Sequence, residues 1–389
     1  MIRESLPKHA EVVIIGGGII GVSIAYYLAK SGMRGILLVE KGLMGEGSTG
    51  KCAGGIRTQF STKINVQFSI ISLHVLRQFQ EEFYIDPEFH RIGYLFLARS
   101  QGQRSILKTT SRLLESMGLQ IKLMDPHEIQ NRWSFLRTND LTGGSYTEND
   151  GYAGPYEVLQ GYIGGARRMG VILAEGTEVT GILSQKGKVH AVETHRGERI
   201  ETPIVINAAG PFASKVATML GLDLPVMSLR RQLFFTDFFE ELPSNIPMTI
   251  DMEYGWYMRR EGKGLLLSGP QDTAPSFCVN TTFEAREWAA DRSIFRVPVL
   301  EHARIANGWA GLYDISLDHH AIIGSFPEME GFICANGFSG HGFMHGPATG
   351  ILVSELIIHG KTKTLDIHPL RPTRFRENDL IHEPLTAFR

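Results

Sequence analysis

The chain has 389 residues, of which 43% are hydrophobic and 21% are charged, as is typical of a globular protein with a large core. This composition excludes a disordered or collagen-like chain. The 39 basic and 41 acidic side chains give a net charge of -2, which disfavours a nucleic-acid-binding surface, and no apolar run approaches the roughly 20 residues that span a bilayer.

Cysteine usage and the N-terminus bear on metal binding and location. The three cysteines, Cys52, Cys278 and Cys334, are odd in number, widely separated and outside any CxxC pair. We therefore expect no disulfide framework and no metal site. The first residues lack the charged, apolar and small-residue regions of a secretory signal, so the expected location is the cytoplasm.

The N-terminal part of the chain predicts a strand–helix–strand unit. Residues 11–15 form a short apolar run that ends at glycines, residues 19–31 have the apolar faces of a helix, and residues 35–40 predict a second buried strand. This order is typical of a βαβ unit with a parallel sheet. A glycine-rich segment follows at 42–55, and the next predicted elements are helix 64–83, strand 94–98 and helix 103–117.

The middle of the chain changes character. Residues 225–269 alternate strand-like runs with turns, as an antiparallel sheet does. The strands expected there are 232–236, 248–252, 255–260 and 264–268. The elements expected around this region are helix 156–168, strands 171–174, 178–183, 189–194 and 203–206, strand 331–335 and helix 345–359. Parallel-sheet signals thus surround antiparallel ones, which predicts an α/β fold with two interleaved domains.

The first strand and helix are joined by a candidate dinucleotide-binding turn. The sequence GGGIIG begins at Gly16: the first glycine permits the turn, Gly18 allows a pyrophosphate to approach the backbone, and Gly21 lets the helix pack on the sheet. Glu40 ends the second strand, where its carboxylate can accept hydrogen bonds from ribose hydroxyls. The alternative is a tight turn in an unrelated α/β protein.

Two further segments favour FAD over NAD. Residues 207–210 (NAAG) follow an apolar strand and offer a second place where small residues admit a ligand, and residues 42–55 are an unusually long glycine-rich stretch for a plain NAD unit. Ordinary loop flexibility is the alternative for both.

A glycine-rich loop near the C-terminus, residues 337–344 (GFSGHGFM), lies between the last strand and the last helix. It leaves backbone N–H groups open at a helix N-terminus, which carries roughly half a positive charge. Such a site would stabilise the negative N1–C2=O edge of a reduced flavin. The alternative is a simple strand–helix connector.

Together, GGGIIG, Glu40, residues 47–60 (GSTGKCAGGIRTQF), INAAG, residues 309–313 (WAGLY) and GFSGHGF resemble the D-amino-acid oxidase superfamily. The chain is most similar to the branch of sarcosine oxidase, glycine oxidase and dye-linked L-proline dehydrogenase. The resemblance implies a Rossmann-like FAD-binding domain, residues 1–90, 148–225 and 322–389, interleaved with an antiparallel-sheet substrate domain, residues 91–147 and 226–321.

The resemblance also implies which residues meet FAD, with Arg57 beside the flavin ring. The implied cofactor-binding residues are Gly16, Gly18, Ile19, Ile20, Glu40, Lys41, Ser48, Thr49, Lys51, Cys52, Gly54, Gly55, Val179, Ala208, Ala209, Gly210, Gly311, Gly340, His341, Gly342, Phe343 and Met344.

Some positions depart from the family pattern. Relatives that attach the flavin covalently use a cysteine where Gly311 stands or a histidine where Lys51 stands, so we expect non-covalent FAD. Relatives that bind a substrate carboxylate use an arginine at Tyr313, or a lysine at Met344 paired with an arginine near Phe60. A carboxylate would therefore need another partner, and the candidates are Arg57, Arg259 and Arg231.

The candidate catalytic residues are Arg57, Tyr254, Tyr257, Tyr313 and His341. Tyr254, Trp256 and Tyr257 lie on a strand that would face the flavin, although simple packing is the alternative. His341 is expected to contact the flavin rather than to act as a base. Monomeric sarcosine oxidases carry a lysine that promotes the reaction with oxygen, and this chain has a leucine at about that position, Leu266. We therefore expect a dehydrogenase that passes electrons to a quinone, a dye or a partner subunit.

The resemblance thus implies oxidation of the C–N bond of an amino acid or secondary amine, with hydride transfer to flavin N5. The alternative is an FAD-binding scaffold, because residues 364–380 and the YMRREGKG turn resemble FAD-domain proteins that assist respiratory complex I assembly. An NAD-dependent dehydrogenase is disfavoured by INAAG and the C-terminal glycine loop.

Overall fold

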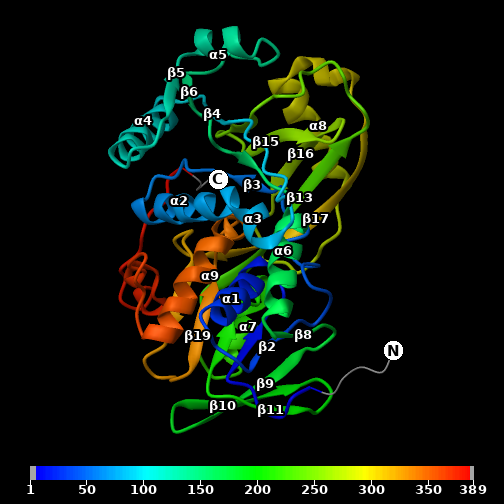
Figure 1. Ribbon diagram of the computed structural model, residues 1–389. Coiled ribbons are helices and arrows are strands. Elements are labelled where there is room, and N and C mark those ends of the chain that lie inside the picture. The colour runs from blue at the N-terminus through cyan, green and yellow to red at the C-terminus, as the bar shows by residue number, and fades with distance from the viewer. Residues whose placement is uncertain (1–5, 386–389) are drawn as a thin grey trace.

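The structure is a computed structural model that describes residues 6–385. A six-stranded sheet forms the lower half of the molecule in Figure 1, with the strand order β18-β19-β12-β1-β2-β8. All neighbours in this sheet are parallel except β18 and β19. Its strands are β1 (Val12–Ile15), β2 (Ile36–Val39), β8 (Ile172–Ala174), β12 (Val205–Asn207), β18 (Ile322–Ser325) and β19 (Phe332–Asn336). The predicted βαβ unit is confirmed.

Strand alternation gives this sheet two different faces. Val12 and Ile14 pack into a cluster with the helices, whereas Val13 and Ile15 pack toward a three-stranded antiparallel sheet, β9 to β11, and α7. Successive side chains of a strand point to opposite faces, so one apolar run serves two cores. The elements involved are α1 (Ile19–Lys30), α6 (Pro155–Arg168), α7 (Ala213–Thr218), α9 (Gly342–His359), β9 (Val179–Gln185), β10 (Lys188–Thr194) and β11 (Arg199–Glu201).

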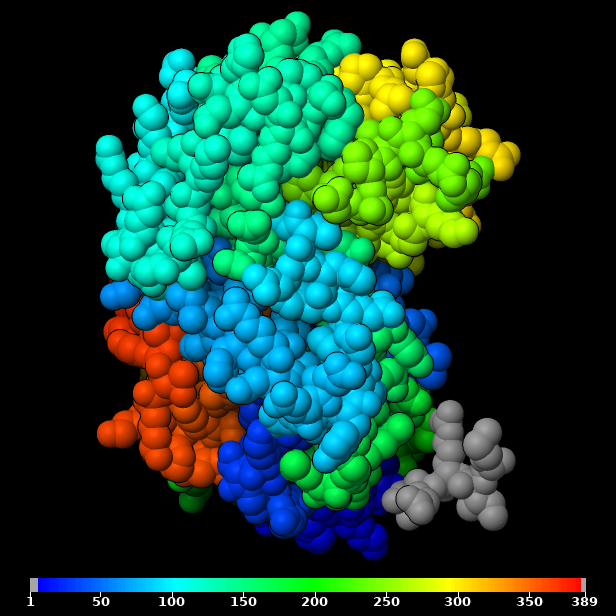
Figure 2. All heavy atoms as spheres, turned by 45° about the horizontal axis from the view of Figure 1, so that its top comes forward, coloured from blue at the N-terminus to red at the C-terminus, as the bar shows by residue number. Residues whose placement is uncertain are grey.

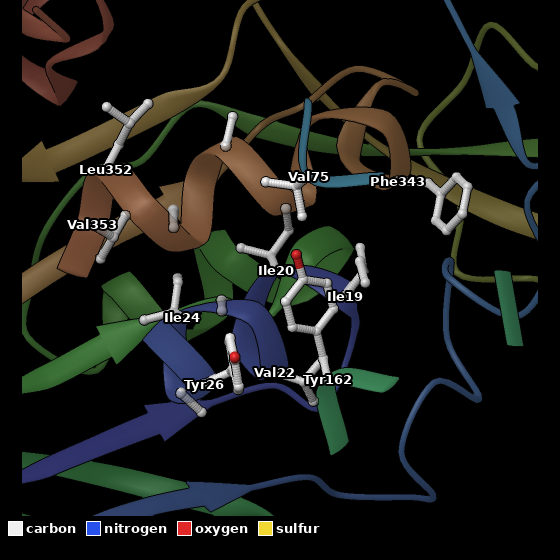
Figure 3. Close-up of a cluster of buried hydrophobic side chains, with 14 of the residues drawn as sticks. Ile19, Ile20, Val22, Ile24, Tyr26, Val75, Tyr162, Phe343, Leu352 and Val353 are labelled. Carbon is white, nitrogen blue, oxygen red and sulfur yellow. The ribbon is translucent and has the colours of Figure 1, made fainter. Parts of the chain in front are cut away.

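Helices α1 and α9 are the central pair of the helical face. Figure 3 shows Ile24 of α1 close to Val353 of α9, and both residues belong to one buried cluster with Ile20 and Leu352. The Ser23 hydroxyl also donates to the Gly346 carbonyl of α9 at 2.9 Å. This packing fixes the N-terminus of α9 relative to the glycine turn that precedes α1.

An eight-stranded sheet forms the upper half of the molecule in Figure 1, in the order β17-β13-β16-β15-β14-β4-β6-β5. Every neighbouring pair is antiparallel except β14 and β4. The strands are β4 (Tyr94–Ala98), β5 (Lys122–Met124), β6 (Gly143–Thr147), β13 (Val226–Thr236), β14 (Met248–Asp251), β15 (Trp256–Glu261), β16 (Gly264–Gln271) and β17 (Ile305–Ser316). The predicted α/β fold, with a Rossmann-like sheet and a largely antiparallel second sheet, is confirmed.

This sheet also has two faces, which we call outer and inner. The outer face, with Leu95, Trp256 and Met258, packs into a cluster with α5 and α8; the inner face, with Phe96 and Tyr257, forms a separate buried cluster. The helices near this sheet are α4 (Gln101–Ser116), α5 (Pro126–Arg132) and α8 (Phe283–Arg296).

Helices α2 (Lys63–Arg77) and α3 (Phe79–Phe83) lie between the two halves, where they form the light-blue surface in Figure 2. The prediction of a single helix over 64–83 was wrong in one respect, because the helix is interrupted at Gln78, which ends α2 and precedes α3. The break lets Phe79 and Phe83 pack against Tyr162 of α6. The short strands β3 (Gly55–Ile56) and β7 (Gly151–Tyr152) pair next to these helices.

The chain passes back and forth between the two large sheets, and the domain boundaries given above remain a prediction. Among residues 6–385, no helix has both the length and the apolar character needed to cross a membrane.

Candidate functional site

The turn after β1 has a geometry that only glycine can adopt at its first position. Gly16 has a φ of +117°, and a Cβ there would lie 2.3 Å from the carbonyl oxygen of Ala208. Helix α1 then begins with Gly18 as its N-cap and without a side-chain cap, while the N–H of Ile19 donates to Thr49 Oγ1 at 3.0 Å. The structure therefore brings the segments 16–19, 49 and 208 together.

Glu40 ties the end of β2 to two loops. Its Oε2 accepts the N–H of Gly17 at 2.8 Å, and its Oε1 accepts the N–H of Gly42 at 2.8 Å. Each carboxylate oxygen can accept a second hydrogen bond, so the half-buried Glu40 keeps capacity for ribose hydroxyls.

The small residues that follow β12 form another part of the surface around the glycine turn. Gly210 faces open space, since a Cβ built there would have no atom of residues 6–385 within 4 Å, and Ala209 packs partly against the cluster that contains Val179. Lys41 Nζ lies 3.1 Å from the ring centroid of Phe212. An uncapped helix N-terminus, two acceptor oxygens and an open glycine wall suit the phosphates and ribose of a dinucleotide.

The glycine-rich segment 42–55 connects this region to the eight-stranded sheet. Ser48 Oγ donates to the Leu312 carbonyl at 2.6 Å, Trp309 Nε1 donates to the Lys51 carbonyl at 2.9 Å, and Arg259 Nε donates to the Ala53 carbonyl at 2.7 Å. Gly54 and Gly55 follow, with Gly55 in β3. The segment therefore lies against the inner face.

The two positions that the family resemblance associates with covalent flavin attachment, Lys51 and Gly311, meet here. A Cβ on Gly311 would lie 3.1 Å from the Cβ of Lys51, although the residues are far apart in sequence. Burial raises the pKa of the neighbouring Cys52 thiol to about 11, so at neutral pH this cysteine is a thiol and a poor nucleophile.

The glycine loop before α9 is held by β17. The Asp314 carboxylate accepts the N–H of Phe338 at 3.2 Å, and the Asp314 carbonyl accepts the N–H of Ser339 at 2.9 Å. Gly340 has a φ of +90°, and a Cβ there would lie 2.6 Å from the Tyr313 ring. Burial raises the pKa of Asp314 to about 6.

Helix α9 begins earlier than residue 345, the start that the sequence predicted, because it starts at Gly342 directly after His341. Phe343 and Met344, which we expected in the loop, are buried in its first turn. The N-cap of α9 is His341, which makes no side-chain cap hydrogen bond, and the preceding Gly340 lies against the Tyr313 ring.

Arg57 and His341 form the polar centre of the site. Arg57 Nη2 lies 3.2 Å from His341 Nε2, and the Arg57 guanidinium stacks 3.8 Å from the ring centroid of Phe60 and 5.4 Å from that of Phe96. Burial and the Arg57 charge hold the pKa of His341 well below its usual range. Because a guanidinium only donates, His341 Nε2 is the acceptor and its neutral ring carries the proton on Nδ1.

Arg57 is only 4% exposed, and within residues 6–385 it forms no ion pair with a carboxylate. Asp150 lies in the same region, but Thr58 N–H donates to it at 2.8 Å, and the hydroxyls of Thr58 and Thr147 also donate to it. Burial raises the pKa of Asp150 to about 6. A buried guanidinium without an anion is costly, and this site therefore suits an anionic ligand.

The inner face contributes a second arginine and two tyrosines. The register pairs Leu229 with Tyr313 and Arg231 with Gly311, so Arg231 and Tyr313 point to the same face of the sheet. Arg231 lies 5.7 Å from the Tyr257 ring centroid, and its buried Nε has no hydrogen-bond partner within residues 6–385. Burial raises the pKa of Tyr257 well above its usual value, and the nearby Tyr313 adds to that shift.

The structure does not bring Tyr254 to this cluster. Its hydroxyl accepts a hydrogen bond from Arg99 at 2.6 Å, and its ring packs with the outer-face cluster. Trp256 also points outward, where its Nε1 donates to Ser293 of α8 at 2.9 Å. Of the three aromatic residues expected to face the flavin, only Tyr257 lies on the inner face.

Tyr94, Phe96 and Asp150 also lie near Arg57, although no sequence motif marked them. Tyr94 and Phe96 alternate along a strand that was predicted, but no motif marked the face that they share. Asp150 stands in an Asn-Asp-Gly turn, a common surface signal, and only the tertiary structure buries it.

Comparison with known proteins identifies the family of the chain. The sequence matches the model of the DAO family, described as FAD dependent oxidoreductase, over residues 11–356. FAD-dependent oxidoreductase domain-containing protein 1 of Xenopus laevis is 32% identical over 418 residues, which cover 95% of this chain and 83% of that protein. Mitochondrial dimethylglycine dehydrogenase of Homo sapiens is 30% identical over 389 residues, which cover 94% of this chain and 44% of that protein.

A solved structure gives the same answer for the fold. The crystal structure of L-proline dehydrogenase from P. horikoshii is similar with a TM-score of 0.90 and 32% sequence identity, covering 97% of this chain and 100% of that one. The family match and the fit of the glycine turn to a dinucleotide lead to one conclusion: the chain belongs to the DAO family of FAD dependent oxidoreductases, and FAD is its cofactor.

Proposed function

We propose that this FAD-dependent oxidoreductase oxidises the C–N bond of an amino acid or secondary amine of the sarcosine, glycine or proline class. The observation that carries the proposal is Arg57, a buried guanidinium without an ion-pair partner among residues 6–385, placed among aromatic rings beside His341. A substrate carboxylate would supply the missing charge. Two of the similar proteins, named dimethylglycine dehydrogenase and L-proline dehydrogenase, act on substrates that carry such a carboxylate.

In this proposal the residues of the glycine turn, with Glu40, Thr49 and the segment 208–210, hold the phosphate and ribose groups of FAD. The glycine loop 337–340 and the first turn of α9 line its isoalloxazine ring. When bound, FAD supplies a hydride acceptor for the carbon next to the substrate nitrogen. We expect the attachment to be non-covalent, because Gly311 has no side chain and the Cys52 thiol is protonated at neutral pH.

Arg57 binds the substrate carboxylate through its guanidinium fork. Its Nη2 already donates to His341, which holds the planar group in one orientation, while Phe60 and Phe96 exclude water from its faces. Each hydrogen bond to a charged group of this kind contributes about 1.5–3 kcal/mol. Arg231, whose Nε has no partner in the described part of the chain, is the second candidate for the same role.

The substrate enters as the neutral amine. His341 cannot act as a general base in the described arrangement, because its Nε2 already accepts a hydrogen bond and burial disfavours its protonation. Tyr257 keeps its proton, since burial raises the pKa of its hydroxyl well above the usual value, and it can donate a hydrogen bond to the substrate. Turnover should therefore rise with pH as more of the free amine becomes deprotonated.

We favour a dehydrogenase over an oxidase. The position where monomeric sarcosine oxidases carry an oxygen-activating lysine corresponds to about Leu266, which is fully buried on the inner face and has no charge to attract superoxide. A quinone, an artificial dye or a partner subunit would then accept the electrons. The cytoplasm remains the expected location.

The test is anaerobic reduction of the bound flavin by sarcosine, glycine, L-proline and hydroxyproline, followed by turnover with an artificial dye. Bleaching by at least one of these compounds, and much slower bleaching in Arg57→Ala, is the expected result. Failure of all four would contradict the proposal. Co-purification of the unreduced protein with a respiratory subunit would then favour the scaffold alternative.

A further inference from the structure

The C-terminal segment, residues 381–385, leaves the surface and enters the interior of the molecule. Leu380 is 37% exposed, whereas Leu385, five positions further on, is fully buried. The segment begins next to a buried ion pair, since the N–H of Ile381 donates to Asp318, which also pairs with Arg374 at 2.8 Å. Both partners of that pair are buried, so the start of the segment is fixed.

Glu383 anchors the segment to the start of α2. Its carboxylate is 2% exposed and accepts hydrogen bonds from the Ser61 N–H at 2.7 Å, from the Ser61 hydroxyl, from the Thr62 hydroxyl at 2.8 Å and from Asn65 Nδ2 at 3.1 Å. The N–H of Leu385 adds a bond to Ser61 Oγ at 3.1 Å. A carboxylate at a helix N-terminus is favoured by the helix dipole. We call this contact of Glu383 with Ser61, Thr62 and Asn65 the latch, because it holds the C-terminal segment against α2.

Ser61 and Thr62, to which Glu383 binds, directly follow residues 57–60, the segment that contains the substrate-binding candidate Arg57. Burial lowers the pKa of Arg57, and nearby charges, including those of Glu383 and Asp150, oppose that shift. The Glu383 carboxylate and the Arg57 guanidinium therefore lie close enough to interact electrostatically.

Leu385 joins the apolar cluster of the inner face. That cluster includes Tyr94, Phe96, Met248 and Tyr257, all of which come from the sheet that covers the candidate substrate site. Phe96 is also one of the two rings that flank Arg57. Figure 1 shows the C-terminal stretch returning between α2 and this sheet, on the side of β3.

We propose that residues 381–385 close the candidate substrate site and that Leu385 is a specificity-determining residue that limits the size of the amine admitted. Glu383 is the positioning residue that holds the closed form. The inference rests on the proposed function for the identity of the substrate, whereas the closure itself concerns the access of any small molecule to the bound flavin.

The experiment uses the FAD-loaded full chain and four variants: Leu385→Ala, Leu385→Met, Glu383→Gln and, as the control, Leu380→Ala. The first measurement is quenching of the bound-flavin fluorescence by acrylamide, a neutral probe that needs no turnover. We expect the quenching constant to rise at least twofold in Leu385→Ala and in Glu383→Gln. It should stay unchanged in Leu380→Ala and return close to the wild-type value in Leu385→Met.

The second measurement compares kcat/KM for N-benzylglycine with that for sarcosine. Leu385→Ala should raise this ratio at least tenfold, and Leu385→Met should restore it. A fall in melting temperature with unchanged quenching and an unchanged ratio would assign Leu385 to packing alone and overturn the inference.

The two measurements separate the failure of this inference from that of the proposed function. If no amine reduces the flavin in any variant, the proposed function fails, and the quenching constants still decide whether the segment closes the site. If quenching rises but the ratio is unchanged, the claim that Leu385 sets specificity is refuted.

Discussion

The two ends of the candidate site are built in different ways. At the phosphate end, Gly16, Gly18 and Glu40 lie within one βαβ unit, and most of the hydrogen bonds involve backbone groups. At the ring end, Arg57, Tyr257 and His341 come from distant parts of the chain and meet through buried side chains. A cofactor common to a whole family can be bound by a local motif, whereas the substrate is selected by side chains that only the complete fold assembles.

The strongest test of this contrast is Gly16→Ala at the phosphate end. The new Cβ would lie 2.3 Å from the Ala208 carbonyl oxygen on a backbone with a φ of +117°, so the turn must distort. We expect loss of nearly all bound FAD, measured by the ratio of flavin to protein absorbance. The control is Gly102→Ala on the surface of α4, where the nearest atom is 3.7 Å away; a variant at Gly16 that retains FAD would contradict the dinucleotide assignment.

At the ring end, Arg57→Ala should leave FAD bound and weaken the binding and oxidation of the substrate. Loss of one or more hydrogen bonds to a charged group, at about 1.5–3 kcal/mol each, lowers kcat/KM by roughly 10- to 200-fold. Arg57→Lys should recover part of the loss, because a lysine keeps the charge without the planar fork. Steady-state kinetics with L-proline and a dye would check this, and an unchanged kcat/KM would transfer the carboxylate role to Arg231.

The buried carboxylates at this end make stability depend on pH. Burial raises the pKa of Asp150 from 3.8 to about 6, so the folded state holds the proton more tightly than the unfolded chain. The resulting stabilisation is fully present below pH 3.8 and is lost as the pH rises through about 6, with a magnitude of at most about 3 kcal/mol at about 1.36 kcal/mol per pKa unit.

Asp150→Asn should therefore flatten the pH dependence of the free energy of unfolding across this window, measured by urea titrations. Asp314→Asn is the matched variant, because burial raises the pKa of Asp314 to a similar value. Asp291→Asn, on the exposed side of α8, should leave the slope unchanged. The same slope in wild type and in Asp150→Asn would show that Asp150 is not protonated in this range.

The smallest expected effect on kcat/KM comes from Tyr257→Phe, which we compare with Tyr254→Phe three positions earlier. Tyr257→Phe removes a hydroxyl from the inner face, and we expect a decrease in kcat/KM of roughly threefold to tenfold, as for one neutral hydrogen bond of about 1 kcal/mol. Tyr254→Phe removes a hydroxyl that bonds to Arg99 on the outer side, so only stability should change. Equal kinetic effects of the two substitutions would contradict the assignment of the two faces.

Much of the cofactor end could be predicted from the sequence, because its signals are local. Each of its three features follows a strand that the apolar residues of the sequence predict. These features are the glycine turn after β1, the acidic residue at the end of β2 and the small residues after β12. The polar α8, with few buried residues, and the glycine-rich β6 were missed, since neither has the periodicity that marks an element.

Strand faces were harder to assign. Tyr254 and Tyr257 were expected to share one role, but Tyr254 precedes β15, in the turn after β14, and its hydroxyl binds Arg99 on the outer side. One-residue alternation within β15 then directs Trp256 outward and Tyr257 inward. The sequence pattern identified the strand, and the packing of α8 on one side decided which residues face the site.

The sequence by itself determined the βαβ unit, the dinucleotide turn and the family, because glycine conformations and apolar periodicity act over a few residues. Only the tertiary structure decided that Arg57 is buried with no ion-pair partner among residues 6–385, that Lys51 meets Gly311 and that Leu385 packs into the inner-face cluster of the second sheet. Burial and charge pairing depend on contacts between segments hundreds of residues apart, and no local pattern encodes them.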